Sequence, residues 1–199
     1  MQKILFLLIP FLIISCKKNE NIPRVQLENK LVSEKEIYEV LISVIGTTSK
    51  DRLMSTNYIT EDISMKFIEE EPAFLRERSL DTLFTPKDID FIKKQIKTIA
   101  NFKLKQKLLE GKIVIPSDTL AKFQTNKNGE GTFWDNYTRK YGNNCFYSIS
   151  LPLFSLDRKT VITISGINCG SLGGSGATEV YRKTNDKWML VATLSNWGS

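Results

Sequence analysis

Apolar residues follow a helical period early in the chain. After residue 33 they recur every three or four positions, at Ile37, Val40, Leu41, Val44 and Ile45. Ser33 and Glu36 stand directly before this run with the spacing of a capping box, in which each side chain satisfies a free backbone N–H at the start of a helix. Gly46 follows as a candidate C-terminal cap. The pattern predicts a helix that begins at Ser33 and ends near Gly46.

A second helical pattern begins at Thr85, where Thr85 is a good N-cap and Pro86 suits the first turn. Four isoleucines then follow at helical spacing, at Ile89, Ile92, Ile96 and Ile99. Shorter patterns predict a strand within 52–60, an irregular or briefly helical segment at 68–79 and a strand at 112–116. They also predict a capped helical turn at 117–123, a loop at 127–131 and a short helix at 132–142.

The period changes from 3.6 to 2 after residue 144, which is typical of strands. We expect strands at 145–154, 160–169, 177–183 and 188–196, the last two joined by a tight turn at 184–187. Helices first and a run of strands last predict an α+β fold. In this fold the N-terminal helices would pack on one face of a C-terminal antiparallel β-meander sheet.

Two cysteines lie at the outer ends of the first two of these strands. When the hairpin is folded about Asp157, Cys145 falls opposite Cys169, and both lie on the face that also carries Leu153. Opposed residues in a hairpin are close enough for a disulfide after slight adjustment, so we predict a Cys145–Cys169 bridge. Two buried free thiols are the alternative, and Pro152 is a place where a bulge would shift the register.

The N-terminus has the layout of a secretory signal, with Lys3, an apolar run from Ile4 to Ile14, and Ser15 before Cys16. The run is shorter than a membrane-spanning helix requires. Ile13, Ile14 and Ser15 ahead of Cys16 resemble the lipobox of bacterial lipoproteins. That resemblance implies a signal peptide at 1–15, lipid (palmitate) attached to Cys16, and anchoring without a membrane span. An ordinary signal peptide with an incidental cysteine is the alternative.

Residues 16–32 are polar and weakly patterned and are expected to be a lipidated tether, followed by a single domain at 33–199. By resemblance to lipoprotein sorting patterns, Lys17 after the cysteine implies the outer membrane. The motifs "FWDNYTRKYG", "CGSLGGSG" and "NDKWMLV" resemble a group of uncharacterised secreted proteins and lipoproteins of Bacteroidetes. The resemblance covers roughly residues 85–199 and implies the fold and an extracytoplasmic location, but it carries no activity.

The composition excludes some kinds of catalytic and metal-binding chemistry but does not identify an activity. The 199 residues include no histidine, which excludes histidine-based triads and histidine metal sites. The net charge of +6, which loses one unit when Lys3 is removed with the signal peptide, does not by itself indicate nucleic acid. An anionic membrane surface is the nearer partner. We expect no nucleic acid partner, cofactor or metal.

Several candidate sites have ordinary structural explanations. The glycine-rich segment 166–176 matches no phosphate-binding motif and predicts positive φ angles or close backbone approach. Ser171 and Ser175 have no visible base. Seven lysines between residues 93 and 112 either contact lipid phosphates or form solvated surface, which is the commoner case. The acidic run Glu69–Glu71 does not converge on one point, and three tryptophans (134, 188 and 197) suit packing, though an exposed one would stack on sugar.

These observations predict a lipid-anchored extracytoplasmic accessory or binding lipoprotein rather than an enzyme, with a protein or an envelope polymer as its partner. Two alternatives remain open. One is a cell-envelope polymer hydrolase that pairs Asp135 with Glu130 or Glu179, which requires two acids about 5–10 Å apart. The other is an inhibitor or immunity lipoprotein, which requires a large exposed apolar or charged patch.

Overall fold

The structure is a computed structural model that describes residues 31–51, 56–62, 78–98, 102–124 and 132–198. The expected signal peptide, Cys16 and residues 16–30 of the expected tether lie outside the described residues, as do most of segment 68–79 and the loop 127–131. Leu31 and Val32, the last two residues of the expected tether, pack against the hydrophobic core, and Val32 is buried.

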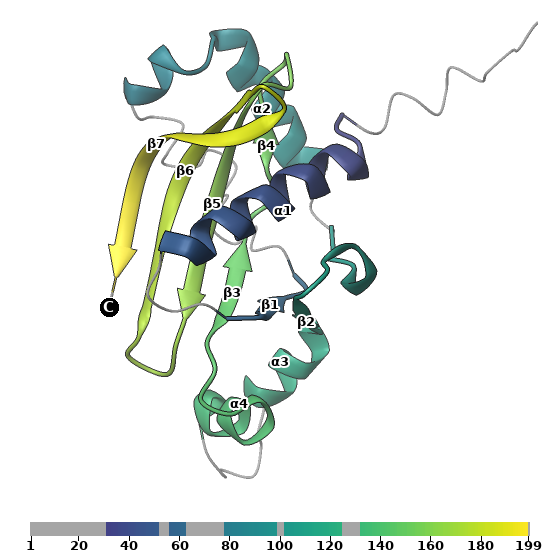
Figure 1. Ribbon diagram of the computed structural model, residues 1–199, viewed down its shortest axis with the longest axis vertical. Helices are drawn as coiled ribbons and strands as arrows, with labels where there is room; N and C mark the ends of the chain where they lie inside the picture. The colour runs from purple at the N-terminus through teal and green to yellow at the C-terminus, as the bar shows by residue number, and fades with distance from the viewer. Residues whose placement is uncertain (1–30, 52–55, 63–77, 99–101, 125–131, 199) are drawn as a thin grey trace, which may run out of the picture.

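The fold is α+β, with all of the described helices before β3 in the chain and a seven-stranded sheet that ends in an antiparallel meander (Figure 1). The helical elements are α1 (Glu34–Asp51), η4 (Arg78–Thr82), α2 (Pro86–Thr98), η5 (Gln106–Leu108), α3 (Ser117–Gln124) and α4 (Phe133–Tyr141). The strands are β1 (Tyr58–Thr60), β2 (Ile113–Ile115), β3 (Phe146–Ile149), β4 (Leu153–Phe154), β5 (Thr160–Asn168), β6 (Gly174–Thr184) and β7 (Lys187–Gly198).

The sheet is mixed, so the expectation of an antiparallel sheet holds only for its C-terminal part. Its strand order is β2-β1-β3-β5-β6-β7, and β4 pairs with β5 beside this path. β1 runs parallel to both β2 and β3, whereas the pairs β3–β5, β5–β6 and β6–β7 are antiparallel. Parallel strands need long connections. Here the segment between β1 and β2 carries η4, α2 and η5, and the segment between β2 and β3 carries α3 and α4.

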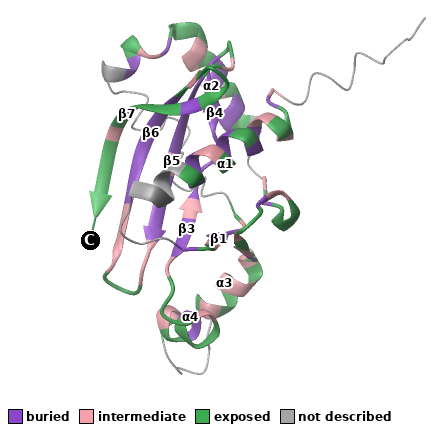
Figure 2. Ribbon diagram, in the orientation of Figure 1, coloured by how far each residue is buried: buried purple, intermediate pink, exposed green. Residues whose placement is uncertain are grey.

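Helices cover both faces of the sheet, which corrects the expectation that they cover only one. α1 crosses one face, here called the α1 face, and packs on Tyr147, Ile149 and Val161 (Figure 1). The opposite face, here called the far face, is covered at one end by α2 and at the other by α4. Side chains along β5 and β6 therefore alternate between a core on the α1 face and a core on the far face. Figure 2 shows these two strands largely buried, whereas β7 is largely exposed.

Three helices begin with the same device. Ser33 and Glu36 form the predicted capping box of α1, with Ser33 N to Glu36 Oε2 at 2.8 Å and Glu36 N to Ser33 Oγ at 3.3 Å. Thr85 with Asp88 at α2, and Thr132 with Asp135 at α4, repeat this arrangement. The predicted end of α1 at Gly46 is wrong, since the helix continues to Asp51. No side chain lies within 4 Å of the Gly46 Cβ position, so glycine is not required there by close packing.

The first hairpin follows the predicted register only at its cysteine end. Tyr147 pairs with Ile167 and Ile149 with Ser165, as folding about Asp157 predicts. Closer to the turn, Leu153 pairs with Ile162, one position away from the predicted partner Val161. Three residues of one strand, Ser150–Pro152, stand opposite two of the other, so the shift lies within this segment, which contains Pro152. Leu153 therefore packs on the far face, which corrects its expected place beside the cysteines.

Candidate functional site

The structure contains the predicted disulfide between Cys145 and Cys169, with a Cα–Cα distance of 4.3 Å. It joins the residue before β3 to the residue after β5, and both cysteines pack against the core of the α1 face. The carbonyl oxygen of Cys145 accepts hydrogen bonds from the hydroxyl of Thr56, just before β1, and from that of Tyr137 in α4, at 3.4 Å. The bridge therefore lies where the meander, β1 and α4 meet.

The glycine-rich segment after Cys169 is a connection between strands, as its sequence predicts. Cys169 N donates to the carbonyl oxygen of Gly173 at 2.7 Å, and Gly170 has a φ of 81°. A Cβ on Gly173 would lie 2.5 Å from the Cys169 carbonyl oxygen, which only glycine avoids. Ser175 is a paired residue of β6, opposite Ile167. The segment closes the turn beside the disulfide.

The carboxylates of the hydrolase alternative do not meet in the described residues. Asp135 is the capping residue of α4, where hydrogen bonds from the Thr132 backbone amide and hydroxyl lower its pKa. Glu179 is buried on the α1 face of β6 and accepts a hydrogen bond from Tyr181 Oη at 2.8 Å. Since α4 packs on the far face, Asp135 and Glu179 lie on opposite sides of the sheet. Glu130 and Glu69–Glu71 lie outside the described residues.

The predicted lysine surface is divided among separate partners. Lys103 pairs with Glu61 at 3.2 Å and Lys105 with Glu34 at 2.6 Å. Lys112 donates to the carbonyl oxygen of Thr56 at 2.9 Å, and burial lowers its pKa. Lys93 and Lys94 also have interaction partners. At least five of the seven lysines therefore have interaction partners.

A groove of about 550 Å³ lies between α1 and the β6–β7 hairpin. Its lining residues are Glu39, Ser43, Lys183, Asp186, Lys187, Trp188 and Met189. Lys183 spans it, with Nζ 3.4 Å from Glu39 Oε2, 4.0 Å from Asp186 Oδ1 and 5.9 Å from the centre of the Trp188 ring. The hairpin turn places Asn185 and Asp186 at positive φ, as the predicted tight turn requires. The groove thus presents both signs of charge beside an apolar wall.

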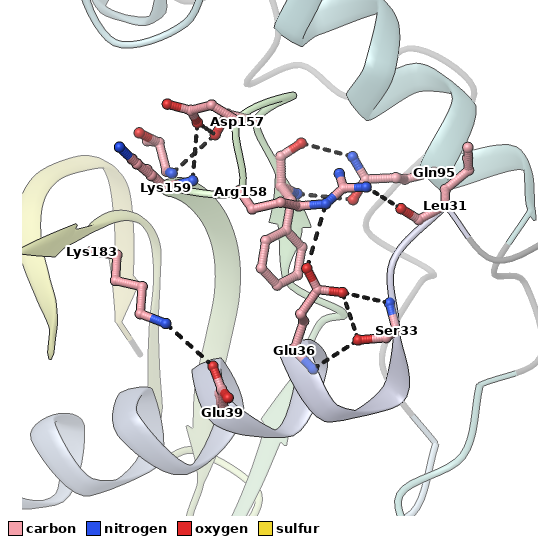
Figure 3. A network of polar contacts seen from close by, with 12 residues as sticks. Leu31, Ser33, Glu36, Glu39, Gln95, Asp157, Arg158, Lys159 and Lys183 are labelled. Atoms are coloured by element: carbon pink, nitrogen blue, oxygen red, sulfur yellow. Dashed lines mark hydrogen bonds and ion pairs between the residues drawn. The ribbon is translucent and has the colours of Figure 1, made fainter. Parts of the chain in front are cut away.

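A polar cluster at the other end of α1 fixes the start of the described domain (Figure 3). Arg158, in the β4–β5 turn, donates to the carbonyl oxygen of Leu31, and its Nε lies 3.5 Å from Glu36 Oε1. Its guanidinium carbon also lies 4.4 Å from the centre of the Phe91 ring. Arg158 has a φ of 62°, a conformation that costs energy for a residue other than glycine. We call this cluster the Arg158 clasp.

The electrostatics of the clasp favour the ionised form of Glu36. Burial alone would raise the pKa of Glu36, but hydrogen bonds from the hydroxyl and the backbone amide of Ser33 and the charge of Arg158 outweigh it. The pKa of Glu36 is therefore lowered. The Glu36 carboxylate thus caps α1 and also pairs with Arg158, which donates to the Leu31 carbonyl oxygen just before the helix.

Sequence reasoning did not identify the Arg158 clasp or the groove. In the sequence, Arg158 is simply a charged residue within an expected turn. Many residue types occur at such positions, so nothing nearby singled it out. The groove depends on the crossing of α1 over β7, which no local pattern specifies. By contrast, the Ser33–Glu36 capping box, the Thr85 N-cap and the disulfide depend on residues at short or strand-like spacing, and the sequence predicted these directly. The capping box at Thr132 was not predicted.

Within the described residues, no helix is long and apolar enough to cross a membrane. Comparison with known protein families, curated proteins and solved structures finds no match to this chain. The predicted membership of the Bacteroidetes lipoprotein group therefore stays a prediction, and function is argued from the residues alone.

Proposed function

We propose that the protein is a lipid-anchored, extracytoplasmic accessory or binding protein. In this proposal Cys16 carries the lipid, the (outer) membrane of the cell envelope is the site of anchoring, and the groove beside α1 contacts a protein partner. The observation that carries the location is the Cys145–Cys169 disulfide, because such bonds persist in oxidising compartments outside the cytosol. The lipobox-like sequence at Ile13–Cys16 supports the same compartment independently.

The chemistry of the groove favours a protein segment as its ligand. Lys187 and Asp186 offer opposite charges at its rim, and Met189 and Trp188 supply an apolar wall. Met189 is 54% exposed, and two further apolar residues of the same strand, Leu190 and Val191, are also exposed. A polypeptide with mixed side chains satisfies all of these groups, whereas a uniformly charged polymer would be repelled by one of the two signs.

Lipidation and location are tested together in cells. Cells expressing the full-length protein are labelled with a palmitate analogue and then fractionated. Cys16→Ser should lose the label and leave the membrane fraction, whereas the double substitution Cys145→Ser with Cys169→Ser should keep both. A wild-type protein that is unlabelled and found among cytosolic proteins would overturn the proposal.

The groove is tested with a photo-crosslinking residue at position 189, compared with one at position 122 on α3. A partner that uses the groove should be captured from position 189 and not from 122. Lys187→Glu, which reverses a charge at the rim, should reduce that capture. Equal capture from both positions, or no effect of Lys187→Glu, would rule out the groove as the contact surface.

The inhibitor or immunity function is the second candidate, and the exposed apolar side chains of β7 favour it. Both functions need a protein partner, so the identity of the captured protein separates them. A secreted toxin captured from position 189 would indicate an immunity lipoprotein, and a resident envelope protein would indicate an accessory role.

A further inference from the structure

Trp197, near the end of β7, lies across a floor of glycines on the far face of the sheet. It pairs with Gly176, which in turn pairs with Gly166. A Cβ on Gly176 would lie 2.5 Å from the indole Cε2, one on Gly166 would lie 3.1 Å from Cζ2, and one on Gly174 would lie 3.3 Å from Cζ3. Three glycines on two strands thus leave room for the ring to rest on the backbone, which is the close approach that the glycine pattern predicts.

The other side of this indole faces solvent. Ring atoms from Nε1 to Cζ3 all lie near the glycine Cβ positions, so one face of the ring is against the sheet. Trp197 nevertheless remains 47% exposed, whereas Trp188, on the α1 face of the same strand, is 6% exposed and packs against Phe154. The third tryptophan, Trp134, is stacked on Phe146. Trp197 is therefore the tryptophan with an open, rigidly held face.

The surroundings of this open face are polar and uncharged. Ser195 Oγ donates to Thr178 Oγ1 at 3.1 Å, two residues from Trp197 and on the same face. Ser148 Oγ lies 3.4 Å from the Cβ position of Gly166. Asn168, opposite Gly174, occupies the same face of the neighbouring strand. Hydroxyl and amide groups thus surround a flat aromatic surface, and no charged residue occupies these far-face positions.

We propose that the open face of Trp197 is a stacking platform for a neutral saccharide. A pyranose ring has an apolar face of C–H groups that suits an indole, and hydroxyl groups at its edge that suit Ser195, Thr178 and Asn168. Because the glycine floor already fixes the ring, binding costs little side-chain entropy. Among the described residues at these far-face positions, an anionic ligand would find no cation and a cationic ligand no carboxylate. This site is separate from the groove and does not depend on the lipid anchor.

Saturation-transfer NMR tests the platform, using full-length protein in detergent micelles. The probes are four neutral oligosaccharides: cellotetraose, maltotetraose, chitotetraose and xylotetraose. At least one should receive saturation on its ring C–H groups. Trp197→Ala should weaken that binding at least about tenfold, the size expected for loss of an aromatic stacking contact. Ile42→Ala, an exposed apolar change on α1, should leave it unchanged.

A second variant separates loss of the platform from loss of folding. Gly176→Ala keeps Trp197 but places a methyl group where the indole lies, so it should weaken binding while the disulfide and the tryptophan content stay intact. Trp197→Phe should keep part of the affinity, since a smaller ring still stacks. No transfer to any of the four probes, or equal binding by wild type and Trp197→Ala, would overturn the proposal.

Discussion

The two ends of the first hairpin are held by different means. At one end, β3 and β5 keep the register that their sequences predict, and the Cys145–Cys169 disulfide joins them covalently. At the other end, β4 is shifted by one residue, and the side chain of Gln95 in α2 holds it. Gln95 Nε2 donates to the Phe154 carbonyl oxygen at 2.7 Å, and Phe154 N donates to Gln95 Oε1 at 2.9 Å.

This difference shows that one end of the hairpin is determined by its own residues and the other end by a residue distant in sequence. The cysteine end follows from the alternation of residues within two strands, so it can be calculated from the sequence. The turn end depends on Pro152, which lacks a backbone N–H, and on a glutamine that lies 59 residues away in the chain. A glutamine side chain carries both N–H donors and a carbonyl acceptor, so Gln95 makes the pair of hydrogen bonds with Phe154 that a neighbouring strand would otherwise make.

Removing the disulfide should have the largest effect on stability. The double substitution Cys145→Ser with Cys169→Ser releases a loop with a sequence separation of 24 residues. The chain-entropy estimate for such a loop is about 3.5 kcal/mol of unfolding free energy. Urea unfolding followed by circular dichroism measures the loss. The single substitution Cys16→Ser serves as the control, because it removes a cysteine without opening this loop, and an equal loss in both proteins would contradict the role of the bridge.

Gln95→Leu should have the next largest effect, because it leaves the amide and the carbonyl of Phe154 buried without their partner. We expect a loss of about 3 kcal/mol in unfolding free energy. Gln124→Leu, the same change at an exposed position of α3, should alter stability by less than about 0.5 kcal/mol. Chemical denaturation compares the two variants. If both proved equally stable, Gln95 would not be what holds β4.

Arg158→Ala should destabilise the turn end by a smaller amount, about 2 kcal/mol, since it removes the contacts with Leu31, Glu36 and Phe91. Arg158→Gly removes the same contacts but relieves the left-handed backbone, so it should be about 1 kcal/mol more stable than Arg158→Ala. Thermal and urea unfolding give the order of the three proteins. An alanine variant as stable as the glycine variant would show that the backbone carries no strain.

Mild acid should weaken the turn end before the cysteine end, and this is the smallest effect. Burial alone would raise the pKa of Asp88, but hydrogen bonds from Thr85 and from the Leu156 amide outweigh it, so the pKa is lowered. Hydrogen bonds from the Ser155 hydroxyl and the Lys159 amide lower the pKa of Asp157. A lowered folded-state pKa contributes stability that is complete above about pH 4 and is lost as the pH falls further.

Hydrogen exchange followed by NMR between pH 6 and pH 3 measures this difference. After correction for intrinsic exchange rates, protection of the Leu156 and Lys159 amides should fall first, while Tyr147 beside the disulfide stays protected. Earlier loss of protection at Tyr147 would contradict the division of the hairpin. Asp157→Asn, which removes one titrating group, should reduce the acid sensitivity of Lys159.

Much of the fold could be predicted because it depends on local patterns. The capping residues Ser33 and Thr85, the tight turn before Lys187 and the alternation around the cysteines all act within a few residues of chain or across one hairpin. The parallel pairing of β1 with β2 and β3 could not be predicted, because these strands are three or four residues long and their partners are distant in sequence. The place of α2 on the far face likewise depends on tertiary packing.

The candidate sites were less predictable than the fold. Trp197 was one of three tryptophans with the same expected role, and only the placement of Gly166, Gly174 and Gly176 beneath it distinguishes it. The groove requires Glu39 and Lys183 to meet across two elements far apart in the sequence. The disulfide was predictable because its two residues are related by a single hairpin axis.

The intact mass of the protein extracted from its native membrane, without reducing agent, tests the central claim most directly. The account predicts a chain that begins at Cys16, carries acyl groups, and is lighter by two hydrogen atoms than the fully reduced form because Cys145 and Cys169 are joined. A chain that still begins at Met1, bears no lipid and has two free thiols at these positions would contradict both the proposed location and the bridge that supports it.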